Sequence, residues 1–469
     1  MITLFRVNTY FHVFSILVVL LLLKVPFISM GLPTLQPELE WLLVGERLNE
    51  GKSLYSDIWT KTGPLTAYVY GFVYWLFGRD QTYYELFALV LAYFQSLYFA
   101  YLINSNRVII ERNYLPALMY AVVISLSFDL SKLTPALMAN TFLLMAVNSI
   151  FKHIDKAGES SEHVFEVGLM IGIGSLFLYS FPAFFFWAIL SLIMFSPFKG
   201  NQVFLMLLGF VLPLFVAVLF FYFNGTFNEF YHQWILQFSR LVPLVGSEIV
   251  GVIVIFLLPT VFAILGSLRV LNNVRYSSFQ NRKHQILILL GVFALLPYFL
   301  SKPHGTYHLI GLAPFLAFYL TGWFIFARGA YLAEVVFLVF LALVMLIKRQ
   351  GLSPLIGNGL QHLTELRVNT GSSKSYAEGK RILVTGDTND DYFTAKAGSP
   401  FVNWEVSKGI LQHPDTYQNL ALIYETFKAE KPDYIIDNEQ VFPEIFDRIP
   451  ELSGAYERVE GTRHFRLKY

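Results

Sequence analysis

Apolar residues gather along the chain in runs that are long enough to cross a lipid bilayer. A transmembrane helix needs roughly 20 apolar residues, and by this measure the pattern predicts about eleven spans. They lie near residues 11–31, 84–103, 114–129, 133–151, 164–180, 181–196, 202–223, 245–268, 285–300, 308–327 and 331–348. The first run is too long for the apolar part of a signal peptide and has no small-residue cleavage site after it, so we interpret it as a retained anchor.

A polar stretch interrupts this pattern directly after the first run. Residues 34–62 carry Glu38, Glu40 and Asp57 together with Lys61. Charge beside a membrane is costly unless water or a substrate meets it, so the cluster is either a functional site or a solvated loop. Residues 64–78 are apolar but short and rich in Tyr and Trp, which favours a juxtamembrane helix beginning at Pro64.

The pattern changes again after residue 350. Residues 351–378 have the composition of a linker, and residues 379–469 predict a small α/β domain. Short apolar runs at 380–387, 432–438 and 463–469 predict strands, and the spacing in 415–430 predicts a helix with Asp415 as its N-cap. A strand, a helix and a second strand indicate a crossover on a parallel sheet. The expected fold class is therefore a polytopic α-helical membrane protein (residues 1–350, with the first extracytoplasmic loop at 32–83) plus a small C-terminal α/β domain.

Composition agrees with this interpretation. Only 14% of the 469 residues are charged, against roughly 25% in soluble proteins. The net charge of +1 gives no reason to expect a nucleic-acid partner, and the absence of cysteine excludes disulfides and thiolate chemistry. Lys and Arg are concentrated in alternate loops, which predicts a cytoplasmic N-terminus and an extracytoplasmic C-terminal domain. The expected location of the protein is the plasma (inner) membrane. Lys348 and Arg349 count against that orientation.

Three further loops lie on the predicted outer side. Residues 128–140 contain Asp129 and Lys132, which we interpret as a loop pair. Residues 224–241 repeat aromatic side chains at three- and four-residue steps, as a surface-lying amphipathic helix would, and end near Arg240, which can bind an anionic donor or lipid headgroups. Residues 301–308 carry Lys302, His304 and His308.

These loops bring together the residue types needed for sugar transfer from a lipid-phosphate donor. A carboxylate acts as general base on an acceptor hydroxyl, and Lys, Arg and His neutralise the departing phosphate. A transporter of lipid-linked sugars or polymers also uses acidic residues, but usually inside its spans. Because the spans contain few Asp or Glu residues, the distribution favours chemistry at the interface.

The first loop also resembles that of the GT-C superfamily of membrane glycosyltransferases, specifically family 39, the protein-mannosyltransferase and aminoarabinose-transferase-like group. The resemblance rests on Glu38, Trp41, Gly51, Leu54-Tyr55-Ser56-Asp57-Ile58-Trp59, Gly63-Pro64-Leu65 and Leu76-Phe77-Gly78. Ala139-Asn140-Thr141, Tyr307-His308 and Pro314 extend it along most of residues 1–350. Two positions depart from the family: Pro37 stands where it has an Asp, and Phe142 where many members have an acid.

The resemblance implies a glycosyltransferase that moves a sugar from a polyprenyl-phosphate donor to an extracytoplasmic glycan, lipid or protein, with inversion at the anomeric carbon. Two alternatives stay open, an inactive scaffold on the same fold and a lipid-linked-sugar transporter. The expected partners are the donor, membrane lipids and an acceptor of unknown identity; a divalent cation, Mg²⁺ or Mn²⁺, is the one cofactor considered. The candidate catalytic residues are Glu38, the first choice as base, Glu40, the second choice, and Asp57 as a second acid. The candidate substrate-binding residues are Lys61, Asn140, Lys302, His304, His308 and Arg240.

Overall fold

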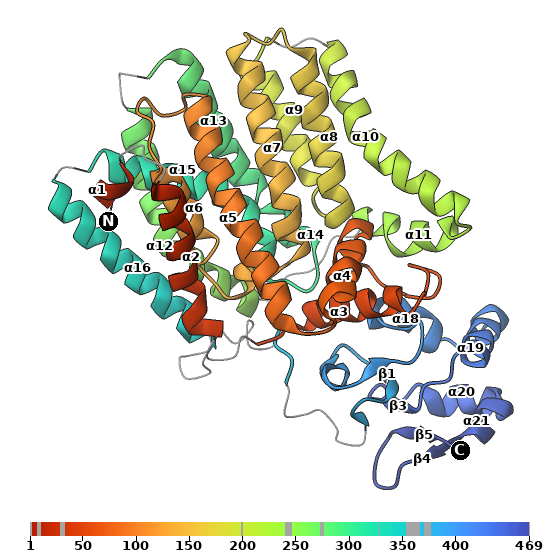
Figure 1. Ribbon diagram of the computed structural model, residues 1–469. Coiled ribbons are helices and arrows are strands. Elements are labelled where there is room, and N and C mark those ends of the chain that lie inside the picture. The colour runs from red at the N-terminus through yellow and green to blue at the C-terminus, as the bar shows by residue number, and fades with distance from the viewer. Residues whose placement is uncertain are drawn as a thin grey trace. The chain divides into compact units, whose positions relative to one another are not determined.

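The computed structural model divides the chain into two compact units (Figure 1). We call Met1–Leu32, Gln81–Val218 and Arg240–Glu365 the helical unit, and Pro33–Asp80, Leu219–Ser239 and Leu366–Tyr469 the mixed unit. The structure describes residues 2–6, 11–28, 33–197, 200–239, 246–272, 276–327, 329–352, 366–369 and 377–468. The mixed unit therefore combines three segments that are far apart in the sequence.

The helical unit contains helices joined by short loops. Among the described residues these are α1 (Ile2–Phe5), α2 (Phe11–Ile28), α5 (Gln81–Ser105), α6 (Leu115–Val123), η1 (Asp129–Ser131), α7 (Pro135–Asp155), α8 (Ser161–Phe177), α9 (Ala183–Phe195), α10 (Gly200–Phe223, whose last turn belongs to the mixed unit), α12 (Gly246–Leu271), α13 (Ser278–Phe293), α14 (Leu296–Leu300), η3 (Thr306–Leu312), α15 (Ala313–Ile325) and α16 (Ala330–Leu352). Helices α7, α8 and α9 run alongside one another (Figure 1).

Every apolar run singled out in the sequence contains a helix, and within the described residues seven helical segments are long and apolar enough to cross a membrane. These segments are Gln81–Ser105, Pro135–Asp155, Gly200–Phe223, Ile249–Leu271, Ser278–Leu300, Thr306–Ile325 and Tyr331–Arg349. The predicted spans at 11–31, 114–129, 164–180 and 181–196 are not among these segments. The prediction at 114–129 is wrong, because α6 has 9 residues, all buried, and is too short to cross a bilayer. Helices α10, α12 and α16 expose many large apolar side chains, as lipid-facing helices do.

A buried carboxylate joins several helix ends in the helical unit. The Glu85 carboxylate lies 2.8 Å from Lys24 Nζ and 2.6 Å from Lys132 Nζ. Lys132, which the sequence led us to pair with Asp129, forms an ion pair with Glu85. Lys348 is also buried, with its Nζ 3.2 Å from the Ser131 hydroxyl. A lysine held inside the protein is a poor indicator of membrane orientation, so Lys348 does not bear on the predicted orientation, which stays a prediction.

The mixed unit combines the first loop with the C-terminal domain. Its described elements are α3 (Gln36–Asn49), α4 (Pro64–Phe77), α11 (Phe227–Gln233), η2 (Ile235–Ser239), β1 (Arg381–Thr385), η6 (Asp390–Phe393), β2 (Lys396–Ala397), α18 (Trp404–Leu411), α19 (Tyr417–Ala429), β3 (Tyr434–Asp437), α20 (Phe442–Arg448), α21 (Pro450–Ala455), β4 (Tyr456–Arg458) and β5 (Phe465–Leu467). The helix predicted to begin at Pro64 is confirmed as α4, with Gly63 as its N-cap.

The C-terminal domain is built on a five-stranded sheet of order β2-β1-β3-β5-β4. Strands β1 and β3 pair in parallel, with Leu383 opposite Ile435, and α19 lies between them in the sequence, which confirms the predicted crossover. Strand β5 pairs antiparallel with β3. The N-cap of α19 is Thr416, whose hydroxyl accepts a hydrogen bond from Asn419 N, so the prediction of Asp415 was wrong by one residue.

A tryptophan from the first loop belongs to the core of the C-terminal domain. Trp59 packs edge-to-face on Phe401, with ring centroids 4.9 Å apart, in a cluster that includes Leu383, Phe427 and Ile435. Its backbone N–H donates to the Pro400 carbonyl at 2.8 Å. The first loop and the C-terminal domain therefore share one hydrophobic core.

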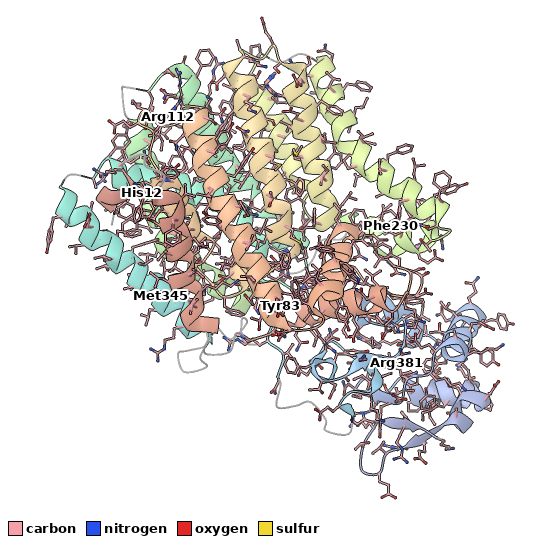
Figure 2. The ribbon with its side chains drawn as sticks, in the orientation of Figure 1. His12, Tyr83, Arg112, Phe230, Met345 and Arg381 are labelled. Carbon is pink, nitrogen blue, oxygen red and sulfur yellow. The ribbon has the colours of Figure 1, made fainter. Side chains whose placement is uncertain are left out.

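The segment predicted as an amphipathic surface helix is shorter than expected and its aromatic face is covered. Helix α11 has seven residues, and Phe230 and Trp234 are 1% exposed. Phe230 stacks on Trp234 and on Phe221, and it also contacts Tyr55 of the first loop. Figure 2 labels Phe230 at α11. Phe230 and Trp234 therefore help to hold the first loop in place.

Helices α3 and α4 approach so closely that a glycine is required between them. A Cβ atom on Gly45 would lie 2.8 Å from the Tyr70 backbone oxygen. We expect Gly45→Ala to lower the free energy of unfolding by about 1–3 kcal/mol through overpacking, despite alanine's better helix propensity. Gly409→Ala in α18 is the matched control, because no atom lies within 4 Å of its added Cβ. Thermal unfolding of the two variants checks this; equal melting temperatures would contradict it.

Candidate functional site

Helix α3 positions the two acids of the first loop on different sides. Consecutive helical residues are about 100° apart, so Glu38 and Glu40 point roughly 200° apart around the axis. The Glu38 side chain is 2% exposed, and its Oε2 accepts a hydrogen bond from Leu35 N at 3.1 Å. Glu38 therefore caps the N-terminus of α3, where a negative charge also complements the helix dipole.

Glu40 is held by one group from the first loop and one from the C-terminal domain. Its Oε1 lies 2.7 Å from the Thr60 hydroxyl, and its Oε2 accepts from Asn403 Nδ2 at 2.8 Å. The side chain is half-buried, so it remains partly accessible. Burial raises the pKa of the Glu40 carboxyl above its usual value, although the hydrogen bonds from Thr60 and Asn403 and the charge of Lys61 oppose the shift. A carboxylate whose pKa is shifted towards neutral pH is suited to take up a proton.

The turn before Thr60 is fixed by its own side chains. Asp57 Oδ2 accepts a hydrogen bond from Ser53 N at 2.9 Å, so this acid stabilises the turn. The buried Tyr55 donates its hydroxyl to the Thr62 carbonyl at 2.8 Å. Lys61 Nζ lies 3.7 Å from a Glu405 carboxylate oxygen. Of the first-loop candidates, Glu38 and Asp57 have clear local structural roles, whereas Glu40 is bound to residues distant in the sequence.

A residue from the third segment of the mixed unit holds the same turn. Gln233 of α11 accepts from Thr60 N at 3.2 Å and donates to the Tyr55 carbonyl at 2.6 Å. Sequence reasoning missed Thr60, Gln233 and Asn403. Asn403 is 363 positions from Glu40. No local sequence pattern indicates that these two side chains meet.

Asn140 lies inside the helical unit. It is 1% exposed, and its Nδ2 donates to the Tyr120 hydroxyl at 2.6 Å and to Gln95 Oε1 at 3.3 Å. These bonds connect α7 to α6 and α5. A role for Asn140 in substrate binding stays a prediction.

The two histidines of residues 301–308 are both buried. His304 places Nδ1 2.9 Å from the Tyr298 carbonyl oxygen. His308 is 4% exposed, and neither of its ring nitrogens has a hydrogen-bond partner among the described residues. Lys302 is exposed. Contact of these three side chains with a donor phosphate stays a prediction.

Asp129 fixes the segment that carries these histidines. Its Oδ2 lies 2.6 Å from the Thr306 hydroxyl and accepts from Tyr307 N at 2.9 Å. Asp129 is fully buried. Sequence reasoning favoured this acid as a partner of Lys132, and its contacts with residues 177 and 178 positions away gave no local signal.

The candidate residues are divided between the two units. Glu38, Glu40, Asp57 and Lys61 belong to the mixed unit, and Asn140, Lys302, His304 and His308 belong to the helical unit. Arg240 lies outside the described residues.

The sequence left a divalent cation, Mg²⁺ or Mn²⁺, open as a cofactor. Within the described part of the chain, no group of three or more His, Asp or Glu side chains is arranged to hold a metal ion. The involvement of Mg²⁺ or Mn²⁺ stays a prediction.

Comparison with known proteins gives a likeness in structure only. No protein-family model and no curated protein sequence matches the chain. Among solved structures, ArnT from Cupriavidus metallidurans bound to undecaprenyl phosphate matches with a TM-score of 0.54 and 12% identity, covering 98% of each chain. Two structures of the Archaeoglobus fulgidus oligosaccharyltransferase match with TM-scores of 0.44 and 0.45 and identities of 14% and 13%, covering 76% and 89% of this chain. The chain spans 56% and 60% of their lengths.

The likeness to ArnT extends over nearly the whole chain, so it defines the fold. The chain therefore has the fold of ArnT, which confirms the fold class expected from the sequence and agrees with the resemblance stated there. At 12% identity the likeness carries the fold and nothing further. The activity has to be argued from the side chains.

Proposed function

We propose that the chain transfers a sugar from a polyprenyl-phosphate donor to an acceptor hydroxyl, with Glu40 as the general base. The observation that carries this proposal is the half-buried Glu40 carboxylate, held by Thr60 and Asn403 and raised in pKa. Two supporting facts are the GT-C fold and the first-loop motif around Asp57. One of the structures with this fold, ArnT, was solved with undecaprenyl phosphate bound.

In the proposed reaction the acceptor oxygen attacks the anomeric carbon of the donor sugar. The bond from that carbon to the phosphate oxygen breaks, and its electron pair leaves with the polyprenyl phosphate. The acceptor proton passes to Glu40, and the anomeric centre is inverted because attack and departure are on opposite faces. A cationic group stabilises the departing phosphate, and Lys61 is the candidate within the mixed unit.

Donor turnover tests the proposal. Full-length protein in nanodiscs would be incubated with undecaprenyl phosphate carrying mannose, glucose or 4-amino-4-deoxyarabinose, together with an envelope extract as a source of acceptor. We expect release of free undecaprenyl phosphate and a sugar adduct on an acceptor, both detected by mass spectrometry. Failure of every donor to turn over would favour the inactive scaffold. Movement of intact donor across liposomes, without release of the sugar, would favour the transporter.

A further inference from the structure

The C-terminal domain contributes a side chain whose orientation at Glu40 is fixed by a second bond. Asn403 is the N-cap of α18, where its Oδ1 accepts from Val406 N at 3.1 Å. Because the oxygen end of the amide faces this N–H group, the nitrogen end is the one presented to Glu40 Oε2, at 2.8 Å. Helix capping therefore determines which end of the amide meets the carboxylate.

The backbone beside Asn403 is paired with the backbone beside Thr60. Asn403 N donates to the Trp59 carbonyl at 3.1 Å, and Trp59 N donates to Pro400 at 2.8 Å. The Trp59 ring packs in the core of the C-terminal domain on Phe401. Thr60, a second partner of Glu40, directly follows Trp59. The side chains of Thr60 and Asn403 are thus held in one arrangement at Glu40 by the domain core.

The hydroxyl of Thr60 allows this arrangement to fit both protonation states of Glu40. Thr60 Oγ1 lies 2.7 Å from Glu40 Oε1 and 2.7 Å from Thr62 Oγ1, and it has a single proton to donate. When Glu40 is ionised, Thr60 donates to it and accepts from Thr62. When Glu40 is protonated, Glu40 donates to Thr60 and Thr60 donates to Thr62. Asn403 can only donate, so it favours the ionised carboxylate.

We infer that Asn403 is a positioning residue for Glu40 and that the C-terminal domain thereby completes the candidate active site. The role of this side chain in catalysis rests on the proposed function, whereas its effect on the Glu40 carboxylate does not. Other charged groups near Glu40 are Lys61 and, through Lys61, Glu405. The C-terminal domain is accordingly part of the machinery and not an appended docking module.

The variants that test the inference keep the helix cap and change the donor. Serine and aspartate are both good N-cap residues, so Asn403→Ser and Asn403→Asp retain an acceptor for Val406 N. Serine removes the amide donor that reaches Glu40, and aspartate places a second carboxylate there. Thr416→Ala is the matched control, since it removes the N-cap of α19 in the same domain without touching Glu40.

The readout is the titration of Glu40 itself. The melting temperatures of the full-length wild-type, Asn403→Ser, Asn403→Asp and Thr416→Ala proteins would be measured from pH 4.5 to 9. Each would be compared with that of the same protein carrying Glu40→Gln in addition. The difference grows from the unfolded pKa upwards, and the pH at which it stops growing reports the pKa of Glu40 in the folded protein. We expect Asn403→Ser to raise it by about one pH unit, as loss of a hydrogen bond to a charged group should, and Asn403→Asp to raise it further. Thr416→Ala should lower the melting temperature without moving the titration.

The outcomes separate this inference from the proposed function. If the Glu40 titration moves and the acidic limb of the donor-turnover profile moves with it, Asn403 positions the base of the reaction. If the titration moves but no donor is turned over, the effect of Asn403 on Glu40 stands and the proposed function fails. If Asn403→Ser and Asn403→Asp leave the titration where it is in the wild-type protein, the inference is overturned, whatever the activity.

Discussion

Glu40→Gln should reduce sugar transfer by about 10²–10⁴-fold, the usual contribution of a general base. Glutamine has nearly the same shape as a protonated glutamate and can donate to Thr60 while accepting from Asn403, so the site should keep its structure. Glu38→Gln and Asp57→Asn are the matched controls, because these acids accept hydrogen bonds from Leu35 N and Ser53 N within their own turns. We expect each control to retain transfer to within about tenfold and to lose about 1 kcal/mol of stability.

The same Glu40→Gln variant should be more stable than the wild-type protein at alkaline pH. Since folding raises the pKa of Glu40, the folded state binds this proton more tightly than the unfolded state. The wild-type protein therefore loses stability as the pH rises from the unfolded value near 4.5 through the higher folded value. The melting temperatures of the two proteins should differ least at pH 4.5 and diverge above it. A transfer rate unchanged by Glu40→Gln, with loss in Glu38→Gln, would move the role of base to Glu38.

Glu430→Gln should destabilise the mixed unit by about 3–5 kcal/mol, because it leaves a buried guanidinium without its main partner. Arg47 is 1% exposed, and its two terminal nitrogens bind both oxygens of Glu430, joining α3 to the end of α19. Glu50 is a further partner of Arg47 at 3.1 Å and offsets part of the loss. Removing the other partner by Arg47→Met should lower the free energy of unfolding by less, because Glu430 keeps Lys52 at 3.5 Å and Arg381 at 3.3 Å. Figure 2 labels Arg381 in the C-terminal domain.

Lowering the pH should reduce the stability of the wild-type protein in a similar way, because it protonates Glu430. Burial raises the pKa of Glu430, but the hydrogen bond and charge of Arg47 outweigh it and hold the pKa below the usual value. The stability that Glu430 contributes is therefore complete above about pH 4.5 and is lost as the pH falls below that value. Thermal unfolding between pH 3 and 7 measures this. The exposed pair of Glu444 and Arg448 supplies the control, since Glu444→Gln should cost less than about 1 kcal/mol. Equal effects of Glu430→Gln and Glu444→Gln would contradict the account.

The pattern of apolar residues was sufficient to predict most helices and the sheet of the C-terminal domain. Long apolar runs and the strand–helix–strand order are local signals, and each apolar run contains a helix. The failure at α6 has a physical cause: residues buried among other helices are apolar on all sides, so a short internal helix has the same composition as a span. The length of the apolar run at 114–129 did not distinguish a membrane span from a short buried helix.

The candidate site was harder to predict because its bonds join distant segments. The sequence placed Glu38 ahead of Glu40, since it compared one loop with a family motif and had no information on what each carboxylate meets. The partners that distinguish Glu40 are Thr60, twenty positions away, and Asn403, 363 positions away. The pairing of Lys132 with Glu85 was missed for the same reason, because proximity in the loop favoured Asp129.

Chemical rescue of Glu40→Ala tests the central claim most directly. Removing the carboxylate leaves a space that a small exogenous acid can enter, so formate can act in place of the missing base. We predict that Glu40→Ala releases free undecaprenyl phosphate at less than about 1% of the wild-type rate and that formate restores release in a saturable manner. Formate should leave Glu40→Gln inactive, because the amide still fills the space. Release by Glu40→Ala at the wild-type rate without formate would contradict the account.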